Sequence, residues 1–142
     1  MNSNKRTILV VDDDPNILKA IGLRLKSCGF EVLTAPDGAE ALGVAELNKP
    51  DLVITDIWMP VGVGLSLAYR LKQSLPGLPV IFLTASKQAG LKDMARQVGA
   101  TAFLEKPYDP EILLAAINHA LEPAGLAAFN NGFSPNGHDS RP

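Results

Sequence analysis

Side chains that could do chemistry together stand at the ends of short apolar runs. They are Asp12, Asp13 and Asp14 after ILVV, Asp56 after LVIT, Thr84 at the end of VIFLT, and Lys106 after AFLE. Oxygen ligands without histidine or cysteine suit a hard cation such as Mg²⁺, which prefers few carboxylates together with phosphate oxygens. An aspartate can also accept a phosphoryl group as a nucleophile, and lysine and threonine can bind the oxygens of that group.

The apolar runs have the composition of β-strands. They cover residues 7–11, 31–35, 52–55, 79–84 and 101–105. The first, third and fourth runs are almost continuously apolar, which is typical of parallel strands covered on both faces. The second and fifth runs are more mixed in composition, which predicts that they form the edges of the sheet.

Segments with a helical period separate the strands. The expected helices cover residues 15–28, 37–47, 65–75, 88–98 and 110–121, and the fourth has the weakest pattern because it is short and polar. Five strands alternating with five helices predict right-handed crossovers and one doubly wound parallel sheet, an α/β fold. Binding sites in such folds form at the carboxyl ends of the strands, where the residues named above would meet.

Composition limits the class of protein. The 142 residues fit one domain, with a net charge of −2 and no cluster of Lys and Arg, which disfavours direct binding to nucleic acid. The N-terminus has no signal-peptide pattern and no apolar run has the length of a membrane span, so we expect a cytoplasmic protein. The single cysteine, Cys28, cannot form an internal disulfide, and we expect it to be buried or half-buried.

Several aspartates are expected to have structural roles. Asp14 and Asp109 precede proline at the start of expected helices, where they would act as N-caps. Asp51 precedes a strand and so lies at the opposite end from the strand-end residues. Beyond Pro123 the helical pattern ends, which predicts a single folded domain over 1–122 and a flexible tail or linker over 123–142.

Four segments together resemble the receiver domain of bacterial two-component response regulators, the CheY-like family. They are ILVVDDDP, LVITDIWMP, VIFLTAS and GATAFLEKPY, in this order, within a match that runs from about residue 6 to 121. The resemblance implies the flavodoxin-like (βα)5 fold with strand order 2-1-3-4-5. It also implies a signalling domain, a phosphoprotein that catalyses only its own phosphorylation and dephosphorylation.

The resemblance assigns a role to each strand-end residue. Asp56 would be the phosphoacceptor and a member of the Mg²⁺ site, in which Asp13 would bind the ion directly, Asp12 would bind it through water, and the carbonyl of Trp58 would be a further ligand. Lys106 would contact the phosphoryl group and Thr84 would follow it as it forms, so that Thr84 and the aromatic Phe103 would be the switch residues. The Lys106–Pro107 bond resembles the family's cis peptide. The phosphoryl donor would be a sensor histidine kinase or a histidine phosphotransfer protein. The output partner or domain would bind the face formed by residues 88–98, 101–105 and 110–121. A homodimer formed through this face is also compatible with the sequence.

Two positions depart from the family pattern. Gly62 stands where the family often has methionine, and Phe103 lacks the hydroxyl of a tyrosine, so any coupling through it must rest on packing. Trp58 either limits the access of water to the site or is exposed packing without a kinetic role.

Two other functions remain as alternatives. The first is a Mg²⁺-dependent hydrolase that forms an aspartyl phosphate on Asp56. Such enzymes usually have a second acid two residues after the nucleophile, where this chain has Trp58. The second is a receiver-like scaffold that works without phosphorylation. Nucleotide binding is disfavoured because no glycine-rich loop follows the first strand.

Overall fold

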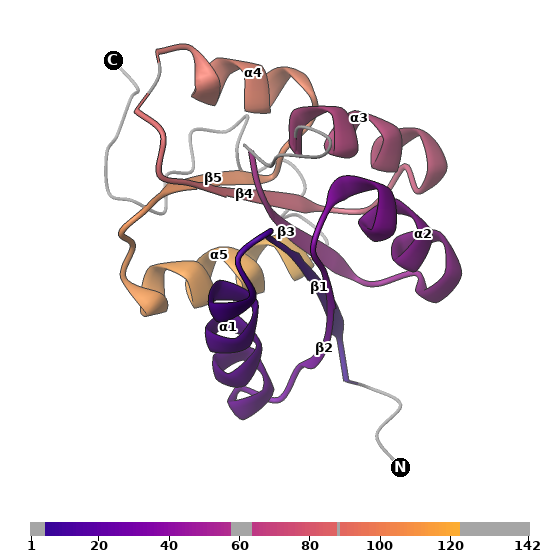
Figure 1. Ribbon diagram of the computed structural model, residues 1–142, viewed down its shortest axis with the longest axis vertical. Coiled ribbons are helices and arrows are strands. Elements are labelled where there is room, and N and C mark those ends of the chain that lie inside the picture. Colours follow the sequence, from indigo (N-terminus) through magenta and orange to yellow (C-terminus); the bar gives the residue numbers. More distant parts are fainter. Residues whose placement is uncertain (1–4, 58–63, 88, 123–142) are drawn as a thin grey trace.

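The computed structural model describes residues 5–57, 64–87 and 89–122 (Figure 1). The strands are β1 (Thr7–Val11), β2 (Glu31–Ala35), β3 (Leu52–Asp56), β4 (Val80–Thr84) and β5 (Ala102–Glu105). The helices are α1 (Pro15–Ser27), α2 (Gly38–Asn48), α3 (Gly64–Ser74), α4 (Leu91–Gln97) and α5 (Pro110–Leu121). Among the described residues, no helix combines the length and the apolar character needed to span a membrane.

The strands form one parallel sheet in the order β2-β1-β3-β4-β5. This confirms the predicted doubly wound fold and its strand order. It also confirms that the two runs of mixed composition are the edge strands β2 and β5. The strand order reverses next to β1, so the carboxyl ends of β1 and β3 lie side by side at the place where such folds bind ligands.

Helices cover both faces of the sheet (Figure 1). On one face, Leu9 and Phe82 belong to a cluster that includes buried residues of α2, α3 and α4. On the other face, their chain neighbours Ile8 and Ile81 pack with buried residues of α1 and α5. Consecutive strand residues point to opposite faces, so only a continuously apolar strand can bury both sides.

Short polar side chains and glycines fix the helix ends. Three N-caps use a carboxylate: Asp14 accepts from Asn16 N–H, Asp37 accepts from Glu40 N–H, and Asp109 accepts from Glu111 N–H. The predicted caps at Asp14 and Asp109 are thereby confirmed. The helix expected over 88–98 is shorter, because Gly90, with φ of 88°, stands at its N-cap and α4 begins only at Leu91.

Two further expectations concern single side chains. Asp51 has a structural role as predicted, because its Oδ2 accepts a hydrogen bond of 2.7 Å from Thr7 N–H at the start of β1. The expectation for Cys28 was wrong, because its side chain is exposed. Helix α1 ends at Ser27, so Cys28 lies beyond the turns that pack on the sheet.

Parts of the sequence interpretation concern residues outside the described ranges. These are Trp58, Gly62 and the segment 123–142 that was expected to be a tail or linker.

Candidate functional site

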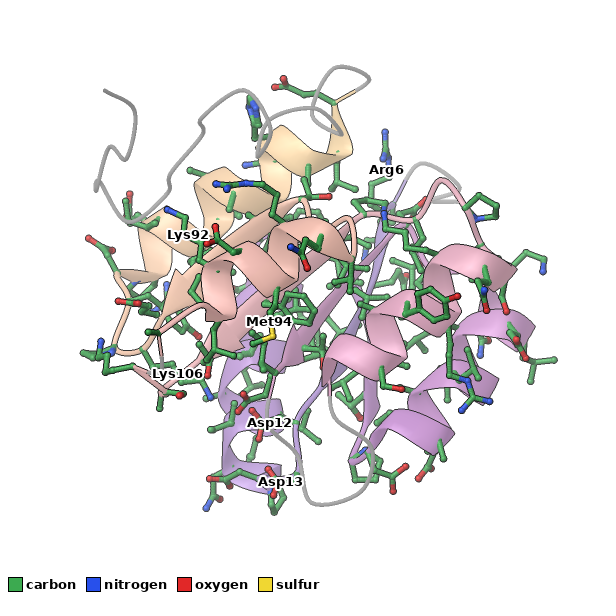
Figure 2. All side chains as sticks on the ribbon, turned by 90° about the horizontal axis from the view of Figure 1, so that it is seen from above. Arg6, Asp12, Asp13, Lys92, Met94 and Lys106 are labelled. Carbon is green, nitrogen blue, oxygen red and sulfur yellow. The ribbon has the colours of Figure 1, made fainter. Side chains whose placement is uncertain are left out.

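The carboxyl ends of four neighbouring strands bring the predicted residues to one edge of the sheet. Asp12 and Asp13 follow β1, and Asp56 is the last residue of β3. Thr84 is the last residue of β4, and Lys106 follows β5. Figure 2 shows Asp12, Asp13 and Lys106 at the same end of the molecule, away from Arg6, which precedes β1.

Lys106 contacts two carboxylates, one just after β1 and one at the end of β3. Its Nζ lies 3.4 Å from Asp12 Oδ2 and 3.4 Å from Asp56 Oδ2. The three side chains are largely buried, with exposed fractions of 19% for Lys106, 5% for Asp12 and 15% for Asp56. The peptide bond from Lys106 to Pro107 is cis, as the resemblance implied. One ammonium group therefore faces two carboxylates, which leaves this cluster with net negative charge.

Burial dominates the electrostatics of Asp12. It raises the pKa of the Asp12 carboxyl above its ordinary value. Hydrogen bonding from Asp14 N–H and the charge of Lys106 lower this pKa, and the charge of Asp56 raises it further. A carboxylate held ionised in this position costs folding free energy.

Asp12→Asn is therefore expected to stabilise the metal-free protein by about 1 kcal/mol at neutral pH. The raised pKa means that the folded state binds more protons than the unfolded state between the two pKa values, so stability is lost as pH rises through this window. The gain from Asp12→Asn should consequently shrink as pH falls to the ordinary range of aspartate. Thermal unfolding in the presence of a chelator, at neutral and at acidic pH, measures both effects.

Asp37→Asn is the matched control, because it removes the same charge at an N-cap where asparagine serves equally well. Its effect should be close to zero at both pH values. A loss of stability in Asp12→Asn, or a gain that does not depend on pH, would contradict the conclusion that the ionised Asp12 carboxylate lowers the stability of the fold.

The Thr84 side chain is hydrogen-bonded to the loop that follows β4. Thr84 is buried, and its Oγ1 accepts a hydrogen bond of 3.1 Å from Ser86 N–H. Its carbonyl oxygen accepts one of 2.7 Å from Lys106 N–H. The backbone thereby connects the hydroxyl-bearing residue directly to the residue that carries the ammonium group.

Phe103 packs inside the sheet-and-helix core. It is 7% exposed and belongs to the same cluster as Leu91 and Ala95 of α4. It stands opposite Phe82 in the β4–β5 register. Phe103 is therefore part of the same packed core as the buried face of α4.

The donor set fits a cation that keeps much of its water. Within the described ranges, no three side chains of His, Cys, Asp or Glu gather closely enough to form a metal cage. Mg²⁺ is usually held by one or two carboxylates, waters and substrate phosphate rather than by such a cage. Asp12 is buried at the site and the adjacent Asp13 is exposed, so the two residues offer carboxylate oxygens at different depths beneath the surface.

A scan against protein-family models matches residues 8–118 to the response regulator receiver domain. The chain belongs to this family. The receiver domain is a signalling domain of two-component systems rather than an enzyme in the usual sense, and the motifs quoted from the sequence all lie within or at the border of the matched range.

Curated relatives of the receiver domain are transcriptional regulators by name. It is 43% identical over 127 residues to the transcriptional regulatory protein GlrR of Escherichia coli (strain K12), covering 89% of this chain and 29% of that protein. It is 35% identical over 125 residues to the alkaline phosphatase synthesis transcriptional regulatory protein PhoP of Bacillus subtilis (strain 168), covering 88% of this chain and 52% of that protein. The chain thus spans about half or less of these two relatives.

Solved structures agree with the receiver fold over nearly the whole of their own length. The chemotaxis protein CheY4 of Vibrio cholerae is 34% identical, with a TM-score of 0.77, covering 82% of this chain and 99% of that one. A CheY-like receiver domain protein of Methanospirillum hungatei JF-1 is 30% identical, with a TM-score of 0.80, covering 83% of this chain and 94% of that one.

The structure of the receiver domain also reveals a pair of residues that the sequence interpretation missed. Lys87 Nζ lies 3.4 Å from Glu105 Oε1 and links the loop after β4 to the end of β5. The sequence contains a signal for this pair, because Lys87 follows Thr84 by three positions and Glu105 directly precedes Lys106. Opposite charges beside two neighbouring strand ends could have suggested the contact.

Proposed function

We propose that this receiver domain accepts a phosphoryl group on Asp56 from a phosphohistidine of a sensor kinase or a histidine phosphotransfer protein. The observation that supports this most directly is the meeting of Asp12, Asp56 and Lys106 at 3.4 Å contacts on the switch-point edge of the sheet. An Asp56 carboxylate oxygen would attack phosphorus and form an acyl phosphate. The P–N bond to the imidazole would break, and the imidazole nitrogen would keep the electron pair.

Each neighbouring residue has a task in this transfer. Lys106 would leave its pairing with the carboxylates and bind a phosphoryl oxygen, and the Thr84 hydroxyl would donate to another. Asp12, Asp13 and Asp56 would hold Mg²⁺, with the carbonyl of Trp58 as a further ligand. The bound ion supplies positive charge that offsets the carboxylates and the transferring oxygens. Hydrolysis of the acyl phosphate by water would later restore Asp56 and release inorganic phosphate.

Phosphorylation would change the surface of the domain by changing how side chains pack in its core. Movement of Thr84 toward the phosphoryl group would change the space available to Phe103, which shares a core cluster with Leu91 and Ala95 of α4. A changed α4–β5–α5 face would then bind an output domain or a partner protein, or a second copy of the chain. This is a shift between two populated arrangements rather than a new fold.

Acetyl phosphate with Mg²⁺ provides the test, because it is a small phosphoryl donor that needs no kinase. Intact mass is expected to rise by one phosphoryl group, and borohydride reduction followed by peptide sequencing should place that group on Asp56. The fluorescence of the single tryptophan, two residues after Asp56, should change at the same time. A label on another residue, or steady turnover of phosphate monoesters, would contradict the proposal and favour a hydrolase.

A further inference from the structure

An exposed ion pair connects the segments that carry Thr84 and Lys106. Lys87 Nζ and Glu105 Oε1 are 3.4 Å apart, and the side chains are 68% and 43% exposed. Lys87 belongs to the loop between β4 and α4, whereas Glu105 is the last residue of β5. The pair therefore spans the gap between two strand ends directly beside the candidate site.

Backbone contacts make this pair part of one network. Thr84 and Glu105 stand opposite each other in the register of β4 and β5. Lys106 N–H donates to Thr84 O at 2.7 Å, and Ser86 N–H donates to Thr84 Oγ1 at 3.1 Å. The first contact fixes the end of the strand, the second fixes the hydroxyl of Thr84, and the ion pair fixes the loop one residue further along.

We propose that the Lys87–Glu105 pair holds the loop after β4 in the resting arrangement. Lys87 and Glu105 are then positioning residues, because this loop affects how Thr84 responds to a phosphoryl group. This inference rests on the proposed function of Asp56 as the acceptor. To reach a group on Asp56, the Thr84 hydroxyl must rotate away from Ser86 N–H or move together with residues 85–87. The second movement draws Lys87 away from Glu105.

The strength of the pair sets the size of its effect. An interaction that is made in only one of two arrangements favours that arrangement by its own free energy. Exposed ion pairs are weak, so the bias corresponds to about fivefold or less in an equilibrium constant. A ligand that needs the other arrangement binds more weakly by the same factor while the resting arrangement predominates.

Beryllofluoride with Mg²⁺ is the probe, because it imitates the phosphoryl group and binds reversibly. Titrations of the full chain, followed by tryptophan fluorescence, are expected to show two- to fivefold tighter apparent binding for Lys87→Gln and for Glu105→Gln, within the limit of about fivefold for an exposed pair. The double variant should bind no more tightly than either single variant. The exchanged pair, Lys87→Glu with Glu105→Lys, should bind like the native chain.

The double-mutant cycle separates this proposal from a simple effect of charge. If Lys87 and Glu105 acted only through the electric field at the site, the two single variants would change binding in opposite directions and the double variant would show their sum. That result, or unchanged binding in both single variants, overturns the proposal. Native-like binding by the exchanged pair supports it, because that variant keeps the contact and reverses each charge.

Asp93→Asn is the matched control, since it breaks another exposed ion pair, that of Arg96 Nη1 with Asp93 Oδ1 at 3.3 Å within α4. It is expected to leave the affinity for beryllofluoride unchanged, and a gain equal to that of Glu105→Gln would overturn the specific role of the Lys87–Glu105 pair. Failure of the native chain to be phosphorylated on Asp56 would reject the proposed function itself. Phosphorylation of Asp56 without any effect of the pair would reject only this inference.

Discussion

Asp56→Asn is expected to reduce phosphorylation by acetyl phosphate about a thousandfold or more, which is the usual size of the loss when a nucleophile is removed. An amide oxygen or nitrogen is a poor nucleophile compared with a carboxylate oxygen, so residue 56 loses the group that would form the acyl phosphate. Incorporation measured by intact mass at matched times gives the ratio of rates. We expect the variant to fold, because it removes one of two neighbouring like charges.

The matched control is Asp51→Asn at the other end of the same strand. Asp51 precedes β3, and its carboxylate accepts from Thr7 N–H, a bond that an asparagine oxygen can also accept. This variant should be phosphorylated at the native rate. Phosphorylation that persists in Asp56→Asn would show that another residue is the acceptor, and a loss in Asp51→Asn would show that the assay responds to damage of the fold.

The fold could be predicted because it depends on hydrophobic pattern over whole elements. Val53 and Ile54 face opposite sides of the sheet and both are fully buried, which a strand under two layers of helices requires. In β2 the exposed Glu31 and Thr34 break that pattern and mark an edge. The start of α4 was harder to predict, because it depends on the left-handed backbone of Gly90 and not on the periodicity of the side chains.

The meeting of Asp12, Asp56 and Lys106 could also be predicted, since parallel topology carries successive strand ends to the same edge. The sequence could not provide the pKa, the exposure or the contacts of individual side chains. The raised pKa of Asp12 comes from its depth beneath the surface, which is a property of the packed tertiary structure. The exposure of Cys28 and the Lys87–Glu105 contact depend on where a helix stops and how a loop turns, and both are local details that hydrophobic patterns do not encode.

Substitutions of the adjacent aspartates after β1 are expected to differ sharply in their effect on Mg²⁺ binding. Asp13→Ala should weaken it strongly, whereas Asp14→Ser should not. Asp13 is an exposed carboxylate next to the buried Asp12, and we propose it as a direct ligand of Mg²⁺. Loss of groups that only support a metal ligand usually weakens binding about 10- to 100-fold, so removal of the ligand itself should exceed about 100-fold. Titration of Mg²⁺, followed by calorimetry and by tryptophan fluorescence, measures both variants.

Asp14→Ser should bind Mg²⁺ within about twofold of the native chain, because serine is also a good N-cap. The Asp14 carboxylate accepts from Asn16 N–H at 2.8 Å, and a serine hydroxyl can take over that bond. Residue 14 donates its backbone N–H to Asp12 Oδ1 at 2.9 Å, and the substitution leaves that group in place. Equal losses in the two variants would mean that the net charge of this segment, and not a ligand at Asp13, determines the affinity for the ion.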